Sequence, residues 1–570
     1  MSKLFTVLFL LLFSASLFAG STIEKKAKRI DSTQDAITSE VIASSFHKTA
    51  AGHVLGSTVY DYGTNSVLSR MMATSATGIH MVYMNRQVAG GDRFVTYDFF
   101  DLSSESFFGN QSLTEDRSTG WGRVVNGKND EALAVTHGGG TSYFADAGEA
   151  FYSFTETAFG DGRVFPCIDR VGDVIVIAAG SDTLYISTDH GSTWSGSTFP
   201  VVPDTAQAPS NSEQEVLIDP TDANHFMSSF ATEGSSDGEG AWIAESNDGG
   251  ATWTYTQVID ELWNNGTQYF VSNFGQYGSV FDAQGTFHAV YNGYGQAAVG
   301  ADTAVIVPVL YWNDRDKAIV EVDGGLGRDT SFSALATGPY PGNGIGNAYP
   351  SIATNGDYVA VVWQKPETDE SGNLIFAKDF PGDSTSGIFS TDIWIATSTD
   401  GGATFSAPKY LAGTTGTSET FPNLTRSIVM VDDKMYVDLL YYVDNSPGVS
   451  LFGEGSAAMG DWVYERIEVD FVTGIGDGEF VAQGFDLKQN FPNPFNPTTE
   501  INFTLKAAQE VTLEVFNTVG QKVAVLLNNQ KMKNGLNKVT FNANGFASGV
   551  YYYTLTAGDL TSTKKMVLMK

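Results

Sequence analysis

The chain has 570 residues and a formal net charge of −33, and 42% of its residues are hydrophobic and 12% aromatic. This length predicts two or three domains, and this apolar fraction is enough to form large cores, which excludes a disordered chain. The acidic balance excludes nucleic acid and anionic membranes as partners, because both select Lys and Arg. The 61 Gly, 24 Tyr and 38 Phe favour short strands and tight turns.

The N-terminus has the pattern of a secretory signal peptide. Lys3 precedes an apolar run over residues 4–13, and Ala19, Gly20 and Ser21 offer a small-residue cleavage site. A membrane span needs about 20 apolar residues, and Ser14 cuts this run short. We therefore predict that residues 1–20 are removed on export, and we predict no transmembrane segment.

One motif, S-x-D-x-G-x-T-[W/F], occurs three times in the middle of the chain, and each copy follows an apolar strand. The Asp side chain can accept hydrogen bonds from the amides of a turn, and Gly supplies a positive φ where the chain reverses. The motif therefore predicts a hairpin held by its own side chains. The copies consist of Ser187, Asp189, Gly191, Thr193 and Trp194; Ser246, Asp248, Gly250, Thr252 and Trp253; and Ser398, Asp400, Gly402, Thr404 and Phe405.

On these residues the chain resembles the Asp-box (bacterial neuraminidase repeat) β-propellers, a group with sialidases, sugar-binding relatives and non-catalytic relatives. The resemblance implies that the Asp boxes are structural and lie on outer turns of the blades, away from the ligand site.

A second repeat places an innermost-strand candidate in each blade. Residues 163–166, 347–350 and 419–422 each end in an aromatic residue and Pro and precede an apolar strand, and weaker counterparts begin near residues 70, 123, 214 and 276. Several strands per repeat of tens of residues indicate radial blades. We predict an all-β chain with a propeller of about seven blades over residues 67–470, with six as the alternative. Residues 21–66 form an N-terminal segment that could supply a closing strand.

The last 85 residues differ from the rest of the chain. A Gly-rich linker over residues 471–485 leads to residues 486–570, where short alternating segments between turns predict a small Ig-like β-sandwich. Residues 490–497 read Asn-Phe-Pro-Asn-Pro-Phe-Asn-Pro, and the chain closes with Lys-Lys-Met-Val-Leu at 564–568. This tail closely resembles the type A sorting domain of the type IX secretion system. The resemblance implies export across the outer membrane and the secretion machinery as a partner.

A sialidase-like site would need three arginines for a carboxylate, a Tyr–Glu pair and an Asp. Arg70, Arg123 and Arg163 each lie near the start of an innermost-strand candidate and could converge into an anion pocket. Asn347 and Glu419 fall at equivalent positions on other blades, and Tyr349 and Glu419 are the candidates for a Tyr–Glu pair, which the spacing does not assign. Sialidases place Arg two positions before Pro, whereas Arg163 stands three before Pro166, so no catalytic set is assigned. Ion pairs that hold the blades together are the alternative role of these arginines.

No other site type stands out in the sequence. The seven His show no zinc spacing, and we expect no metal or cofactor apart from calcium, which the Asp-rich turns at 313–316 and 369–373 could hold. Two functions remain open: a surface or secreted protein that binds glycan or protein ligands, and a secreted sialidase-like glycoside hydrolase acting on acidic sugars. Convergence of the three arginines with a carboxylate pair in a funnel would separate them.

Overall fold

The computed structural model describes most of the chain from residue 52 onward, and the predicted signal peptide lies outside this part. The chain divides into two compact units, the first made largely of residues before 471 and the second largely of residues 471–570. The described residues are 52–63, 70–180, 183–198, 214–232, 240–259, 268–271, 277–299, 302–306, 308–324, 347–368, 376–380, 383–413, 417–431, 434–448, 450, 457–471, 485–487, 490, 493, 495–505, 509–517, 521–533, 535–557 and 560–569.

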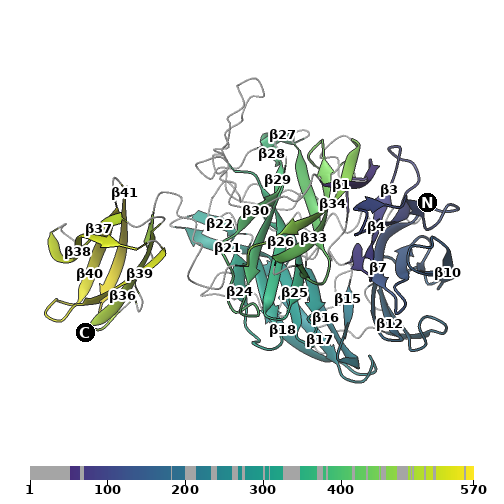
Figure 1. The fold of residues 1–570 in the computed structure, drawn as a ribbon, viewed down its shortest axis with the longest axis horizontal. Coiled ribbons are helices and arrows are strands. Elements are labelled where there is room, and N and C mark those ends of the chain that lie inside the picture. Colours follow the sequence, from purple (N-terminus) through teal and green to yellow (C-terminus); the bar gives the residue numbers. More distant parts are fainter. Residues whose placement is uncertain are drawn as a thin grey trace. The chain divides into compact units, whose positions relative to one another are not determined.

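The described part of the first unit contains seven antiparallel sheets of four to six strands (Figure 1). The sheets are, in chain order: β2(Met72–Thr74), β3(Gly78–Asn85), β4(Phe94–Asp101), β5(Ser106–Phe107) and β6(Gln111–Ser112); β7(Gly120–Asn126), β8(Ala132–His137), β9(Thr141–Asp146) and β10(Phe154–Ala158); β11(Cys167–Val171), β12(Val174–Ala179), β13(Thr183–Ser187) and β14(Ser195–Thr198); β15(Glu215–Asp219), β16(Asp222–Thr232), β17(Gly240–Ser246) and β18(Thr254–Ile259); β20(Tyr277–Phe281), β21(Phe287–Val299), β23(Val309–Asn313) and β24(Val320–Asp323), with β19(Gln268–Val271) and β22(Asp302–Ile306) beside β21; β25(Ala348–Asn355), β26(Tyr358–Pro366), β29(Thr391–Ser398) and β30(Lys409–Ala412); and β31(Ser418–Leu424), β32(Val429–Val431), β33(Lys434–Asp444), β34(Gly460–Glu468) and β1(His53–Thr58). A separate hairpin joins β27(Phe376–Phe380) and β28(Asp383–Phe389).

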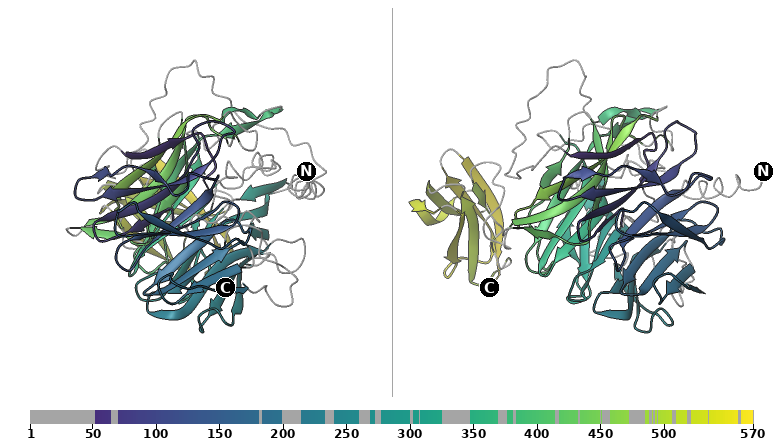
Figure 2. Two further views of the ribbon diagram at one scale, coloured as in Figure 1. Left: turned by 90° about the vertical axis from the view of Figure 1, so that its right-hand side faces the viewer. Right: turned by 45° about the vertical axis from the view of Figure 1, so that its right-hand side comes forward.

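The sheets follow one another around the unit in chain order (Figure 2). The first strands of successive sheets contact each other along the series β2, β7, β11, β15, β20, β25 and β31. The last sheet takes its outer strand from the start of the chain, because β1 pairs with β34, as Figure 1 shows. The predicted N-terminal segment thus contributes residues 53–58 to this sheet. The arrangement is that of a β-propeller-like fold.

Apolar faces between neighbouring sheets form the core of the first unit. Strands such as β3 and β12 are buried over nearly their whole length, because each sheet packs against a sheet on both sides. One cluster joins Val176 of β12, Phe226 of β16 and Phe287 of β21, all nearly inaccessible to solvent. The described residues contain no α-helix, and no helix among them is long and apolar enough to cross a membrane.

The turn after the third strand has the same backbone conformation in six sheets. In each, the fourth residue after the end of that strand has a positive φ: Glu105 (50°), Ala150 (52°), Gly191 (80°), Gly250 (86°), Lys317 (51°) and Gly402 (90°). Only the sheets that carry Gly191, Gly250 and Gly402 show the Asp-box motif in sequence. In the other three turns Asp101, Asp146 and Asn313 occupy the position of the box Ser and accept the turn amides.

The three Asp boxes share one hydrogen-bond pattern, shown here for the first. Ser187 Oγ donates to Asp189 Oδ1 at 2.8 Å, and Asp189 also accepts the Thr193 amide and hydroxyl at 2.8 and 2.6 Å. These donors hold the pKa of Asp189 below its ordinary value. The His190 amide then donates to the Asp173 carbonyl in the first hairpin of the same sheet at 2.9 Å. Each box therefore ties its own turn to its own sheet.

The box glycines also touch the preceding sheet, which makes Gly402 sensitive to substitution. A Cβ on Gly402, at φ 90°, would lie 2.2 Å from the Tyr311 phenol. We expect Gly402→Ala to lower the free energy of unfolding by about 3 kcal/mol, since backbone strain and overpacking add. Gly356→Ala is the control, because Gly356 has a similar positive φ of 59° with nothing within 4 Å. Equal losses in urea titrations of the two variants would contradict the contact argument.

The second unit consists of two sheets around one apolar core. The strands β35(Phe485–Leu487), β36(Thr498–Leu505) and β39(Gly535–Asn542) form one sheet, and β38(Lys522–Met532), β37(Gln509–Asn517), β40(Gly549–Ala557) and β41(Leu560–Leu568) form the other. Ile501 and Phe503 from the first sheet and Leu513, Val515 and Tyr553 from the second lie in one buried cluster. Alternating burial along β37 and β40 accounts for the alternating sequence pattern.

Candidate functional site

The first strands of five sheets share a strained residue near their start. It lies in the left-handed region, which non-glycine residues rarely adopt, and is Arg70 (68°), Trp121 (50°), Phe165 (55°), Tyr349 (52°) or Phe421 (54°). The aromatic members pack in pairs, with ring centroids 4.9 Å apart for Trp121 and Phe165 and 4.7 Å for Tyr349 and Phe421. Arg70 is the one cation in this set.

The three arginines considered for an anion pocket stand at three different registers relative to this strained residue. Arg70 occupies the position itself, Arg123 follows Trp121 by two residues, and Arg163 precedes Phe165 by two. Their surroundings differ accordingly. Arg123 is buried and its Nη1 donates to the Gly122 carbonyl at 2.9 Å, whereas Arg163 is exposed. The structure does not give the three side chains equivalent positions.

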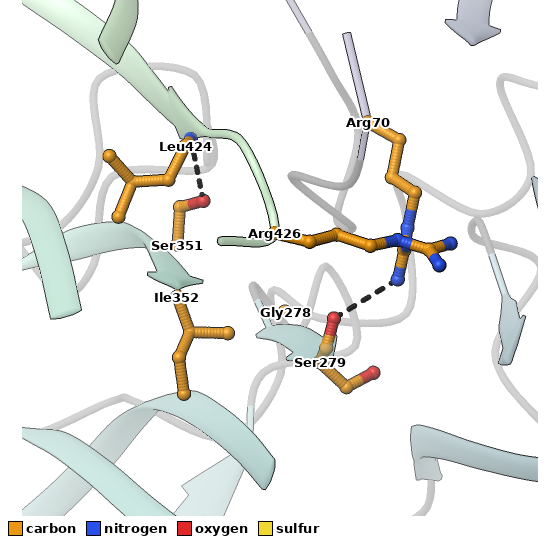
Figure 3. Close-up of a pocket in the computed structure, with 7 residues that line it drawn as sticks. All are labelled: Arg70, Gly278, Ser279, Ser351, Ile352, Leu424 and Arg426. Atoms are coloured by element: carbon orange, nitrogen blue, oxygen red, sulfur yellow. Dashed lines mark hydrogen bonds between the residues drawn. The ribbon is translucent and has the colours of Figure 1, made fainter. Parts of the chain in front are cut away.

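Arg70 is buried in an ion pair that joins sheets far apart in sequence. Its Nε donates to Glu215 Oε1 at 2.8 Å, and its Nη2 lies 2.6 Å from the same oxygen and donates to the Ser279 carbonyl at 3.2 Å (Figure 3). Glu215 Oε2 accepts the amide and hydroxyl of Ser279 at 3.1 and 2.8 Å. Arg70 and Glu215 are 5% and 1% exposed, so the pair is closed to solvent.

A second ion pair, between Arg426 and Asp169, lies close to the first. Arg426 Nη2 donates to Asp169 Oδ1, and the Ile218 amide donates to Asp169 Oδ2 at 2.8 Å. Burial raises the pKa of Asp169 to about 6, although Arg70 opposes the shift. Arg70 and Arg426 both line a cavity of about 10 Å³, shown in Figure 3. This volume is about that of one water molecule, too small for a sugar.

The remaining predicted residues lie in two places. Asn347 and Tyr349 are fully buried at the start of β25, where Tyr349 belongs to the aromatic packing. Glu419, at the start of β31, is 1% exposed and accepts the Thr417 hydroxyl at 2.9 Å. The charge of Glu419 contributes to the raised pKa values of Asp392 and Tyr410.

Glu419 belongs to a carboxyl cluster between the sheets of β25 and β31. Burial, and then the charges of Glu367 and Glu419, raise the pKa of Asp392 to about 8. Burial likewise raises the pKa of Glu367. On the same side Tyr441 donates to Glu465 Oε1 at 2.8 Å. The cluster therefore gathers several carboxyls, and it raises the pKa of one of them, Asp392, above the neutral range, as the general acids of acid–base chemistry require.

The Asp-rich turn considered for calcium is held by its own side chains. Asn313 Nδ2 donates to Asp316 Oδ2 at 3.0 Å, and Arg315 pairs with Asp316 at 2.9 Å. The other turn, at 369–373, lies outside the described residues. Within the described part of the chain, no group of three or more His, Cys, Asp or Glu is placed to hold a metal ion.

Four residues of these clusters escaped the sequence analysis. Glu215 and Asp169 lie in first strands where the repeat marks the start of the strand but not the acidic residue, Arg426 lies between β31 and β32, and Asp392 lies at the start of β29. Their partners are 145 residues away for Glu215 and 257 for Asp169. The charged pair Asp169 and Arg170 inside the first strand at 167–171 is the one signal that could have found Asp169.

Comparison with known proteins identifies the tail but not the first unit. Residues 489–569 match the family described as the Secretion system C-terminal sorting domain. The chain therefore carries the signal for type IX secretion, which implies export to the cell surface or the medium. A search of curated proteins finds no match.

Solved structures similar to the chain are distant. One is YCF48 bound to D1 peptide, with 11% identity, a TM-score of 0.36 and coverage of 72% of this chain and 94% of that one. A protein of unknown function from Dyadobacter fermentans has 11% identity, a TM-score of 0.35 and coverage of 73% and 99%. The N11 neuraminidase-like protein of A/flat-faced bat/Peru/033/2010 has 9% identity, a TM-score of 0.33 and coverage of 75% and 95%. At these scores we infer no activity from the likeness.

Proposed function

We propose that this protein is a cell-surface or extracellular propeller of seven blades that binds a glycan or protein ligand without turning it over. The seven sheets of the first unit are its blades, the Asp boxes are structural, as in the Asp-box propellers, and the second unit is an Ig-like sorting domain. The domains run from a signal peptide at 1–20 through the propeller to the sorting domain at 486–570.

The observation that carries this proposal is the small size of the cavity described between the first strands. Arg70, one of the predicted anion ligands, already forms an ion pair with Glu215. The cavity that Arg70 lines has a volume of about 10 Å³, which is too small for a sugar. In this proposal the sugar binds on the exposed ends of the sheets, where Arg163 is accessible. An exposed guanidinium in an acidic protein favours a carboxylate or sulfate group on the ligand.

The export part is tested by removing the tail. A chain that lacks residues 486–570 should remain inside the cell envelope, whereas the full chain reaches the surface or the medium, as measured by fractionation and immunoblotting. A truncated chain that still appears outside would show that the tail is not the export determinant.

The binding part is tested with the purified full chain on a glycan array and in a fluorogenic sialoside assay. We expect binding without turnover, and Arg163→Gln should weaken binding about tenfold, the loss of about 1.4 kcal/mol. Arg117→Gln is the control, because it removes a partly exposed guanidinium at a different position of the first unit. If no glycan binds, the remaining ligand class is a protein, and a pull-down with the wild-type chain would be compared with one that uses the Arg163→Gln variant.

The carboxyl cluster favours a second candidate, a glycoside hydrolase acting on acidic sugars. Asp392, whose pKa is raised to about 8, would be the general acid, and Glu419 or Glu367 would be the second carboxyl of the pair. Under this alternative Asp392→Asn abolishes sialoside turnover while the protein stays folded. Absence of turnover in the wild-type chain between pH 5 and pH 8 would reject it.

A further inference from the structure

The cavity between the first strands has a polar lining that the proposed ligand binding does not use. Arg70, Ser279, Ser351 and Arg426 line it together with the apolar Ile352 and Leu424, and Figure 3 shows the two guanidinium groups on one side of it. Arg70 precedes β2 of the first sheet, Ser279 lies in β20 of the fifth sheet, and the other residues belong to or follow β25 and β31 of the last two sheets, so the cavity lies among the first strands of several sheets.

The acceptors around the cavity are already occupied. Glu215 Oε1 accepts from Arg70, and Glu215 Oε2 accepts the Ser279 amide and hydroxyl. Asp169 Oδ1 accepts the Arg170 amide at 2.7 Å and an Arg426 N–H, while its Oδ2 accepts a backbone amide. Little carboxylate capacity is left to bind a further donor.

The donors, by contrast, are in excess. Arg70 Nη1 is buried and has no hydrogen-bond partner, although the side chain is only 5% exposed. Ser351 Oγ accepts the Leu424 amide at 3.0 Å, which leaves its own O–H free to donate. An unsatisfied N–H of a buried guanidinium costs several kcal/mol unless an acceptor is supplied. A cavity with spare donors and filled acceptors suits an anion better than a cation.

We propose that this cavity binds a chloride-sized monovalent anion through Arg70 Nη1, the Arg426 guanidinium and the Ser351 hydroxyl. The anion bridges the sheets of β2, β25 and β31, and so fastens the first sheet to the last two. An exported protein meets chloride in the medium, so the ring would be strengthened after it leaves the cell. The cavity volume of about 10 Å³ favours a small anion over sulfate and larger anions.

The charges around the cavity predict that anion binding depends on pH. Arg70 and Arg426 balance Glu215 and Asp169 when both carboxyls are ionised, so an added anion makes the group negative. Arg170, on the same strand as Asp169, directs its guanidinium to the Asn126 and Gly172 carbonyls. Protonation of Asp169, whose pKa burial raises to about 6, leaves one net positive charge. Chloride should therefore bind more tightly at pH 5 than at pH 8.

The test measures thermal unfolding of the full chain in sodium chloride and in sodium gluconate at equal ionic strength. We expect Tm to be about 2 °C or more higher in chloride at pH 5, with a smaller difference at pH 8. Ser351→Ala should remove the chloride effect, and Ser228→Ala, which changes a buried serine of β16, should keep it. Equal Tm in the two salts, or a chloride effect that survives Ser351→Ala, would overturn the proposal.

A diffraction experiment tests the anion site independently, because it uses the wild-type chain and needs no variant that could fail to fold. Crystals of the wild-type chain soaked in sodium bromide should show an anomalous peak between Arg70 and Ser351. Bromide peaks on the surface alone would reject the site.

Discussion

Replacing Arg70 by methionine should lower the free energy of unfolding of the first unit by about 3–5 kcal/mol. The Glu215 carboxylate is 1% exposed, and the substitution removes the cation that pairs with it. Among the described contacts, the amide and hydroxyl of Ser279 then remain as its donors. The loss is measured by urea titration at pH 7 with tryptophan fluorescence. All nine Trp precede residue 471, so the signal reports the first unit and not the sorting domain.

Two further variants make this result specific to the buried pair. Lys128→Met breaks the exposed pair of Lys128 with Asp173, whose side chains are 42% and 56% exposed, and should cost less than 1 kcal/mol. The double variant Arg70→Met/Glu215→Gln removes both charges and should recover part of the loss. If Arg70→Met cost no more than Lys128→Met, the ion pair would not be what holds the first strands together.

The sequence predicts repeated sheets well because their turns carry local signals. The Asp boxes need Ser, Asp, Gly and Thr within eight residues, and the side-chain hydrogen bonds inside each box span four residues at most. The same turn in three other sheets has Asp101, Asp146 or Asn313 in place of Ser and no box Gly, so the motif search missed it. Backbone conformation is shared more widely than the motif.

The candidate site could be predicted only in part, because its register and its pairs are not local. The sequence places the three arginines near strand starts but does not show the residue with positive φ in those strands. At that residue the strand pairing changes register, between Gly120 and Arg123 in β7 and between Ala348 and Ser351 in β25. A one-residue shift turns a side chain to the other face of a strand. The partners of Arg70 and Arg426, Glu215 and Asp169, then meet them only through the closed ring.

Asp392→Asn should stabilise the first unit at alkaline pH by roughly 3–5 kcal/mol, discounted for partial exposure. The pKa of Asp392 rises from 3.8 to about 8 in the folded protein, first through burial and then through the charges of Glu367 and Glu419. Below about pH 4 the carboxyl is protonated in both the folded and unfolded states and contributes nothing. Between pH 4 and pH 8 the folded state holds a proton that the unfolded state has lost, so stability falls as pH rises.

Above pH 8 the wild-type chain carries the full free-energy cost of an ionised Asp392 in the folded state. The Asn variant does not carry this cost, because Asn resembles the protonated acid. Urea titrations at pH 5 and pH 9 should therefore show a difference between the two proteins that grows with pH. Asp116→Asn is the control, because Asp116 is 79% exposed and should shift stability little at either pH. A constant difference between pH 5 and pH 9 would mean that Asp392 does not retain its proton. A variant that is more stable yet inactive on a sialoside would assign that proton to catalysis, because unfolding could not explain the loss.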